Sequence, residues 1–264
     1  MSPQKKWAAG YLAAFIVMIV MNYFVGTNVG NVADSNQPII QPAGFAFSIW
    51  GLIYILVFIW IIKQFFQKTW EGSPVYKLKY WPIINFLLNS AWILVFTQQM
   101  ILASVIVIFA LLITLIIMHI LITNQNYSWF DRFPYSVYFA WVTVASIVNV
   151  FQLTNDNNIN SIAGLDELTW TIIMLSAAGV IGLITAFYFK DWLYPLVIIW
   201  PLYAIYVENS SEYSSLDITL LIISVLLAAC SVITVLFKNK NKNPFNQAGK
   251  RVYKEREDLC VKYI

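Results

Sequence analysis

The stretch ILASVIVIFALLITLIIMHILIT, residues 101–123, decides the fold class, because no lysine, arginine, aspartate or glutamate interrupts it. A helix needs ~20 apolar residues to cross the hydrocarbon core of a bilayer. Segments of similar character lie on both sides of this stretch. The chain is therefore predicted to be an all-α, polytopic membrane helix bundle of about eight transmembrane helices. The predicted spans are 7–26, 43–66, 80–99, 101–123, 133–154, 168–189, 192–208 and 216–237.

Charged residues divide the loops between these spans into two classes. All 16 lysines and arginines fall in the N-terminal segment, in every second loop and in the C-terminal tail, whereas the alternate loops contain only acidic charges. Cytoplasmic loops collect lysine and arginine. We therefore expect a multi-pass protein of the cell membrane with both termini in the cytoplasm.

The composition excludes several classes of protein. With 60% hydrophobic and only 11% charged residues, the chain is not expected to form a soluble core. The net charge of +3 follows from the cytoplasmic excess of cations, so nucleic acid is not an expected partner. The basic tail, 238–264, is expected to contact anionic lipid. The first apolar segment is predicted to be retained as a span, and Cys230 and Cys260 are expected to be reduced.

Ionisable side chains are almost absent from the predicted spans, which argues against proton or ion coupling. His119 is the only histidine, and a single imidazole cannot form a metal site. It is interpreted as a helix-end residue bonded to backbone or head groups. No set of acid, base and nucleophile is evident. We therefore predict no catalytic residues, no metal, no cofactor and no enzyme activity.

Aromatic residues are the second signal, because the chain has 11 tryptophans and an aromatic content of 17%. About half of the tryptophans fall near predicted helix ends, where an amphipathic ring prefers the head-group level. The others lie deeper, where an indole N–H needs a partner. These deeper residues are Trp50, Trp60, Trp92, Trp141 and Trp200.

Three predicted helices each carry an aromatic and polar face at helical spacing. The second presents Phe47, Trp50 and Tyr54, the third Asn85, Asn89, Trp92 and Phe96, and the fifth Tyr138, Trp141, Ala145 and Asn149. Such faces can line a slot for a planar amphipathic ligand. They can also pack helices together, with asparagine bonding between them, and the pattern alone favours packing.

Three motifs occur in order along these helices: PAGFAFSIWGLIY at 42–54, LNSAWILVF at 88–96 and WVTVASIVN at 141–149. Together they resemble the TspO/MBR family, which includes bacterial tryptophan-rich sensory proteins and the mitochondrial translocator once called the peripheral benzodiazepine receptor. The resemblance covers roughly 7–154. It implies a five-helix core, a possible homodimer, and a pocket for porphyrins, sterols or drugs. It assigns to that pocket Trp50, Asn89, Trp92, Trp141, Ala145 and Asn149, to which the aromatic faces add Tyr54, Phe96 and Tyr138.

The chain departs from the family pattern in two places. Gly44 and Ser48 replace a tryptophan and a proline that usually precede the second helix, and three helices follow the family's five. We therefore predict a TspO-like core at 1–154, an additional three-helix segment at 155–237 and the basic tail. In the added segment, Ala178, Gly182 and Ala186 form a small-residue ridge for helix packing.

Two functions follow from these observations. The first is a sensor or carrier that binds a tetrapyrrole-like or isoprenoid-like hydrophobic molecule. The alternative is a transporter or membrane scaffold in which the added helices dominate and the aromatic faces are structural.

Overall fold

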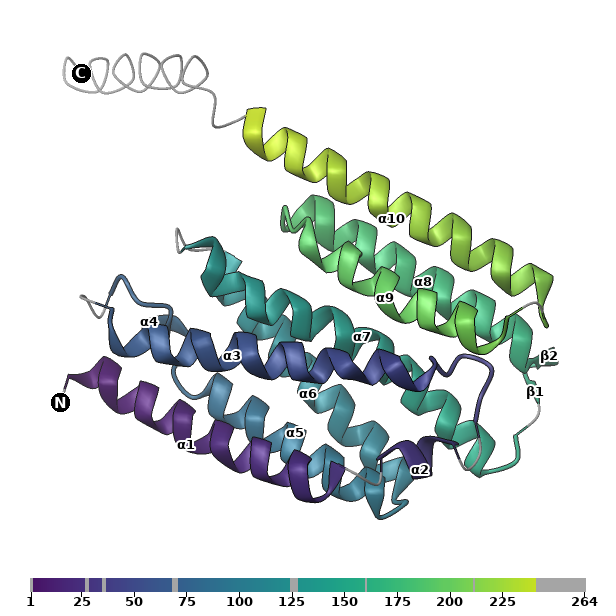
Figure 1. The fold of residues 1–264 in the computed structure, drawn as a ribbon, viewed down its shortest axis with the longest axis horizontal. Helices are drawn as coiled ribbons and strands as arrows, with labels where there is room; N and C mark the ends of the chain where they lie inside the picture. Colours follow the sequence, from purple (N-terminus) through teal and green to yellow (C-terminus); the bar gives the residue numbers. More distant parts are fainter. Residues whose placement is uncertain are drawn as a thin grey trace, which may run out of the picture.

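The computed structural model describes residues 2–26, 29–34, 37–67, 71–123, 128–159, 161–210 and 212–240, and it forms a bundle of long helices (Figure 1). Residues 241–264 lie outside the described part, so the predicted lipid contact of the tail and the state of Cys260 stay predictions. The long helices are α1 (Pro3–Phe24), α3 (Ile49–Phe65), α5 (Trp81–Thr97), α6 (Ile101–Thr123), α7 (Trp129–Asp156), α8 (Glu167–Tyr188), α9 (Leu193–Glu208) and α10 (Ser214–Lys240).

These helices coincide with the predicted spans. In the described part of the chain, 6 helices are long and apolar enough to cross a membrane, and α5 and α9 are shorter apolar helices. The prediction of an all-α, polytopic membrane protein is therefore confirmed. The count of eight spans stays a prediction, because it depends on α5 and α9 crossing as well.

Five helices form a closed ring. Helix α1 packs against α3 and α5, α5 against α6, α6 against α7, and α7 against α3. Helix α7 is largely buried, whereas α6 exposes large apolar side chains such as Ile106 and Ile113. Outward apolar side chains are what lipid contact requires. The ring comprises the helices of the predicted 1–154 core.

The remaining helices form a second layer beside this ring (Figure 1). Helix α9 packs against α7 on one side and against α8 and α10 on the other, and α8 packs against α10. Gly182 permits this closeness, because a Cβ there would lie 2.7 Å from Leu227 Cδ2 and 3.1 Å from Ile198 Cδ1. The small-residue ridge that includes Ala178 and Ala186 is buried, as its predicted packing role requires.

Short elements that the sequence analysis did not predict lie at the helix ends. They are α2 (Val29–Asp34), the 3-10 helix η2 (Gly44–Ser48), α4 (Val75–Leu78), and the strands β1 (Ser161–Ile162) and β2 (Leu165–Asp166). The strands pair antiparallel, with Ser161 opposite Asp166. Gly164 closes the hairpin with φ +77°, a conformation that glycine adopts at little cost.

The two ends of the bundle differ in charge. The end that holds the N-terminus carries every lysine and arginine whose side chain the structure describes: Lys5, Lys6, Lys63, Lys77, Lys79, Arg132 and Lys190. We call it the basic end. The opposite end, which holds α2 and the hairpin, carries Asp156, Asp166, Glu167, Glu208, Glu212 and Asp217, and we call it the acidic end. That the basic end is cytoplasmic stays a prediction.

Candidate functional site

An aromatic cluster lies inside the ring, between α3, α5 and α7. Trp50 of α3 stacks on Trp92 of α5, with ring centroids 6.3 Å apart and planes at 29°. The edge of Trp141, from α7, meets Trp50 at 6.2 Å and 85°. Trp92 stacks in turn on Phe96, one helical turn further along α5, at 5.2 Å. The structure thus brings three of the predicted tryptophans together, with Trp50 in contact with both of the others.

Helical spacing explains why these side chains meet. Residues four apart lie one above the other on a helix face. Trp50 and Tyr54 are so spaced, and their rings stack at 5.8 Å. Trp141, Ala145 and Asn149 repeat the same step along α7. Ala145, which has a small side chain, leaves room beside the tryptophans.

A cavity of about 40 Å³ borders this cluster. Of the predicted site residues, Trp50, Trp92, Phe96, Trp141, Ala145 and Asn149 line it. The prediction missed Val29, Ala33, Gln41, Pro42, Val144, Val148 and Gln152, and it named Phe47 only as part of an aromatic face. Small-molecule pockets usually measure ~300–1,000 Å³. In this structure the rings themselves therefore fill most of the slot, and a large planar molecule needs them to move apart.

The other predicted residues form a polar chain beside the cavity rather than its wall. The Tyr54 hydroxyl donates to Asn22 Oδ1 at 2.7 Å, and Asn22 Nδ2 donates to Asn89 Oδ1 at 2.8 Å. Asn89 Nδ2 donates to the Tyr138 hydroxyl at 2.9 Å. This chain connects α3, α1, α5 and α7. Asn22 was missed by the sequence reasoning, although an asparagine in an apolar span was an available signal.

Asn149 links three helices. Its Oδ1 accepts a hydrogen bond from Trp92 Nε1 at 2.8 Å, and its Nδ2 donates to Ser104 Oγ of α6 at 2.9 Å. Such bonds between membrane helices contribute ~0.6 kcal/mol each on average. The amides of Asn89 and Asn149 therefore have protein partners, as the packing interpretation expects.

Trp141 differs from its neighbours. Its Nε1 is buried and has no hydrogen-bond partner among the described residues. A buried donor without a partner costs roughly 1–3 kcal/mol. Trp141 lines the cavity, and its Nε1 is a buried donor at this site that has no partner among the described residues.

Residues 37–48, which we call the strap, lie beside the cavity and contribute Gln41, Pro42 and Phe47 to its wall. The Phe47 ring meets Trp141 edge-on at 5.9 Å. The strap carries the first motif up to the start of α3, so its position determines how the wall of the slot closes.

Hydrogen bonds from the second layer hold the strap. Two of these bonds involve α9. The Ala43 amide of the strap donates to the Ala204 carbonyl at 3.1 Å, and Trp200 Nε1 of α9 donates to the Ala46 carbonyl at 3.0 Å. The deep Trp200 of the sequence analysis thus has its N–H partner in the strap.

The beginning of the strap is held at the acidic end of the same layer. Asn209 Nδ2 donates to the Ile39 carbonyl at 2.9 Å, and the Ile39 amide donates to Glu167 Oε1 at 2.6 Å. Gln37 Nε2 donates to Glu208 Oε1 at 2.9 Å. The added helices therefore contact the motif-bearing core directly.

At the basic end, a group of charges lies between α6, α7 and the segment before α9. Asp191 accepts a hydrogen bond from Ser136 Oγ at 2.5 Å, and its Oδ2 lies 3.7 Å from Arg132 Nε and 3.6 Å from His119 Nε2. His119 is buried, and neither ring nitrogen has a hydrogen-bond partner among the described residues. The interpretation of His119 as bonded to backbone or head groups is wrong, because its side chain is fully buried and has no hydrogen-bond partner among the described residues. Sequence reasoning missed this group because its members are far apart in the chain.

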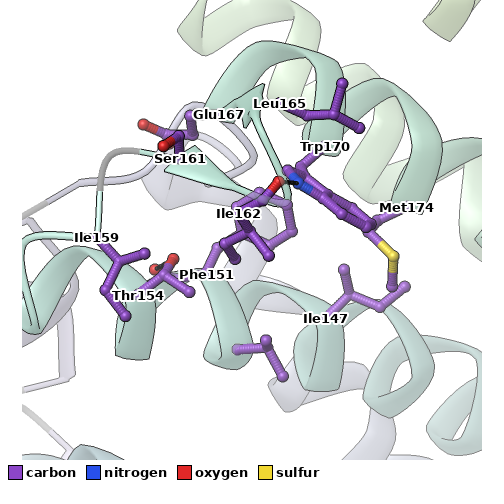
Figure 2. Close-up of a pocket in the computed structure, with 11 residues that line it drawn as sticks. Ile147, Phe151, Thr154, Ile159, Ser161, Ile162, Leu165, Glu167, Trp170 and Met174 are labelled. Atoms are coloured by element: carbon purple, nitrogen blue, oxygen red, sulfur yellow. Dashed lines mark hydrogen bonds between the residues drawn. The ribbon is translucent and has the colours of Figure 1, made fainter.

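A second cavity, of about 160 Å³, lies at the acidic end between α7, the β1–β2 hairpin and α8 (Figure 2). Its wall includes Ile147 and Phe151 of α7, Ile162 of the hairpin, and Trp170 and Met174 of α8. Trp170 Nε1 donates to the Ile162 carbonyl at 2.9 Å, which joins the hairpin to α8. Sequence reasoning did not predict this cavity, because it did not predict the hairpin.

The fold and the cluster define a polytopic helical membrane protein with a tryptophan-lined interior slot. The chain matches the family model described as TSPO-like protein over residues 7–234, so it belongs to this family. The predicted TspO/MBR relationship is confirmed. The matched region extends past the three motifs and includes α8, α9 and most of α10. No match was found among curated proteins or among solved structures.

Proposed function

We propose that this TspO-type membrane protein binds a planar, hydrophobic small molecule between α3, α5 and α7, as a sensor or carrier. A tetrapyrrole-like or isoprenoid-like molecule suits the site, because flat rings and apolar side chains surround it. The supporting observation is that Trp141 lines the cavity while its buried N–H lacks a partner among the described residues. A ligand acceptor there would remove the cost of that orphan donor.

Ligand entry requires Trp50 to separate from Trp92. Stacked aromatic pairs contribute ~0.5–1.5 kcal/mol beyond the area they bury. A planar ligand inserted between the two rings replaces one ring contact with two, so the new contacts offset the stacking energy that is lost. The strap must move with Phe47, and its hydrogen bonds to α9 oppose that movement.

A second candidate function is a membrane scaffold in which the aromatic faces only pack helices. The small cavity and the bonded amides of Asn89 and Asn149 favour it. The two functions differ in what loss of a ring does to ligand affinity.

Titration of the purified protein with protoporphyrin, followed by tryptophan quenching, separates them. Trp92→Ala and Trp141→Ala remove contact area in the slot and should each weaken binding by ~2 kcal/mol, or about thirtyfold. Trp92→Phe should cost much less. The control is Trp129→Ala, because Trp129 is exposed at the basic end. Normal affinity in both folded Trp→Ala variants would leave packing as the role of these rings.

A further inference from the structure

The second cavity, at the acidic end, is separate from the aromatic slot. Helix α7 lies between them: Ala145 and Asn149 line the slot, whereas Ile147 and Phe151 line the second cavity. Residues two apart on a helix point to nearly opposite faces. An occupant of one cavity therefore does not touch the other, and the second cavity needs its own explanation.

Size restricts what this cavity can hold. Its volume of about 160 Å³ lies far below the ~300–1,000 Å³ of sites for drug-sized ligands. A cavity of ~150 Å³ accepts a molecule as small as benzene. The cavity is therefore too small for a tetrapyrrole, and its occupant is a small ring or a short segment of one hydrocarbon chain.

Three of the four polar side chains of the wall already have protein partners, and the fourth, Ser161, is exposed. Trp170 Nε1 donates to Ile162, as Figure 2 shows, and Thr154 Oγ1 donates to the Phe151 carbonyl at 2.8 Å. Glu167 Oε1 accepts from the strap. With these groups engaged, the remaining wall of isoleucine, valine, leucine, phenylalanine and methionine side chains offers dispersion contacts. That chemistry matches hydrocarbon.

The surroundings of the cavity indicate where the hydrocarbon comes from. Ile159, Ile162 and Leu165 belong to its wall, yet they are 46%, 42% and 38% exposed. Adjacent exposed apolar side chains mark a surface that another phase covers. Trp170 lies in the first turn of the membrane helix α8, at the level where tryptophan meets lipid head groups. The cavity therefore faces the bilayer.

Charge near the cavity restricts the head group. Asp166 is exposed beside Glu167, and no lysine or arginine with a described side chain lies at the acidic end. An anionic head group would be repelled there, whereas an ammonium group would be attracted.

We propose that this cavity holds the segment of one acyl chain nearest the head group of a phospholipid, taken from the leaflet at the acidic end, and that this head group bears an ammonium. The lipid joins α7, the hairpin and α8 by filling the space between them. The lipid site is distinct from the slot on which the proposed function rests. The lipid proposal therefore holds even when that slot binds no ligand.

The test uses the full-length protein in nanodiscs of phosphatidylcholine that contain phosphatidylethanolamine with a photoreactive acyl chain. After illumination, mass spectrometry counts cross-links at Ile147 and Phe151. Met174→Phe fills the cavity and should lower these cross-links about tenfold, because the larger side chain displaces roughly two methylene groups of the acyl chain. Ile173→Phe is the matched control, since Ile173 is exposed at the same depth on α8 and should leave them unchanged. Met174→Ala enlarges the cavity and should raise them.

Three outcomes would overturn the proposal. Equal cross-linking in Met174→Phe and Ile173→Phe would show ordinary annular lipid. Equal labelling by photoreactive phosphatidylglycerol would remove the ammonium preference. Absence of lipid cross-links at Ile147 and Phe151 in the wild type would show that no acyl chain occupies the cavity. Each variant is first checked as a monodisperse, folded protein, and the Ala and Phe substitutions must shift the signal in opposite directions.

Discussion

The hydrogen bonds between the strap and α9 provide the sharpest prediction about the second layer of helices, α8 to α10. Trp200→Phe keeps an aromatic ring at the position where Trp200 meets Phe45 but removes the N–H that donates to Ala46. Asn209→Leu removes the donor to Ile39 at similar side-chain size. At ~0.6 kcal/mol for each bond, the double variant should favour opening of the strap by ~1.2 kcal/mol, or about eightfold.

Hydrogen exchange of the peptide 37–48 measures this opening, because the exchange rate follows the population of the open strap. The double variant should exchange about eightfold faster there, and each single variant about threefold. Thr219→Val is the control, since the Thr219 hydroxyl bonds only within α10, to Ser215. Unchanged exchange would show that these two hydrogen bonds do not hold the strap closed. Equal acceleration in α6 would show general loosening of the protein, which also contradicts it.

Three other predictions concern stability and topology. In a double-mutant cycle, Trp92→Phe and Asn149→Leu should couple by ~0.6 to 1.7 kcal/mol in reversible unfolding, and no coupling would deny the bond between them. Hydrogen bonds from the Thr169 hydroxyl and amide lower the pKa of Asp166, so this carboxylate stabilises α8 fully above the ordinary aspartate pKa. The difference in Tm between the wild type and Asp166→Ala should shrink as pH falls through the lowered value, and a constant difference would contradict this. Cysteine placed at Asn158 should react with an impermeant reagent outside intact cells while the native cysteine of the tail does not, and the reverse pattern would invert the topology.

Much of the fold was predictable because its signals are local. The length of the apolar segments predicts the spans. A spacing of three or four residues places Trp92 and Phe96 on one face of a helix. Cation distribution predicts the sides of the loops, and in the structure the described lysines and arginines do share one end. The motif residues Trp50, Trp92 and Trp141 meet because each lies on the inward face of its helix.

The rest depends on contacts between distant segments. Nothing local to Trp200 indicates that its N–H reaches Ala46, which is 154 residues away. The size of the slot was also beyond sequence reasoning, because whether rings line a space or fill it depends on how closely three helices approach. Asn22 became relevant only when α1 was placed beside α5.

The central claim is that the slot between α3, α5 and α7 admits a planar ligand. Its most direct test is a protoporphyrin titration of the wild type beside Ala145→Phe, which fills the space next to the tryptophans. We expect protoporphyrin to quench the wild type saturably at micromolar concentration. The folded variant should bind at least tenfold more weakly, which is a loss of ~1.4 kcal/mol in binding free energy. Absence of saturable binding by the wild type, or equal affinity in both proteins, would contradict the claim.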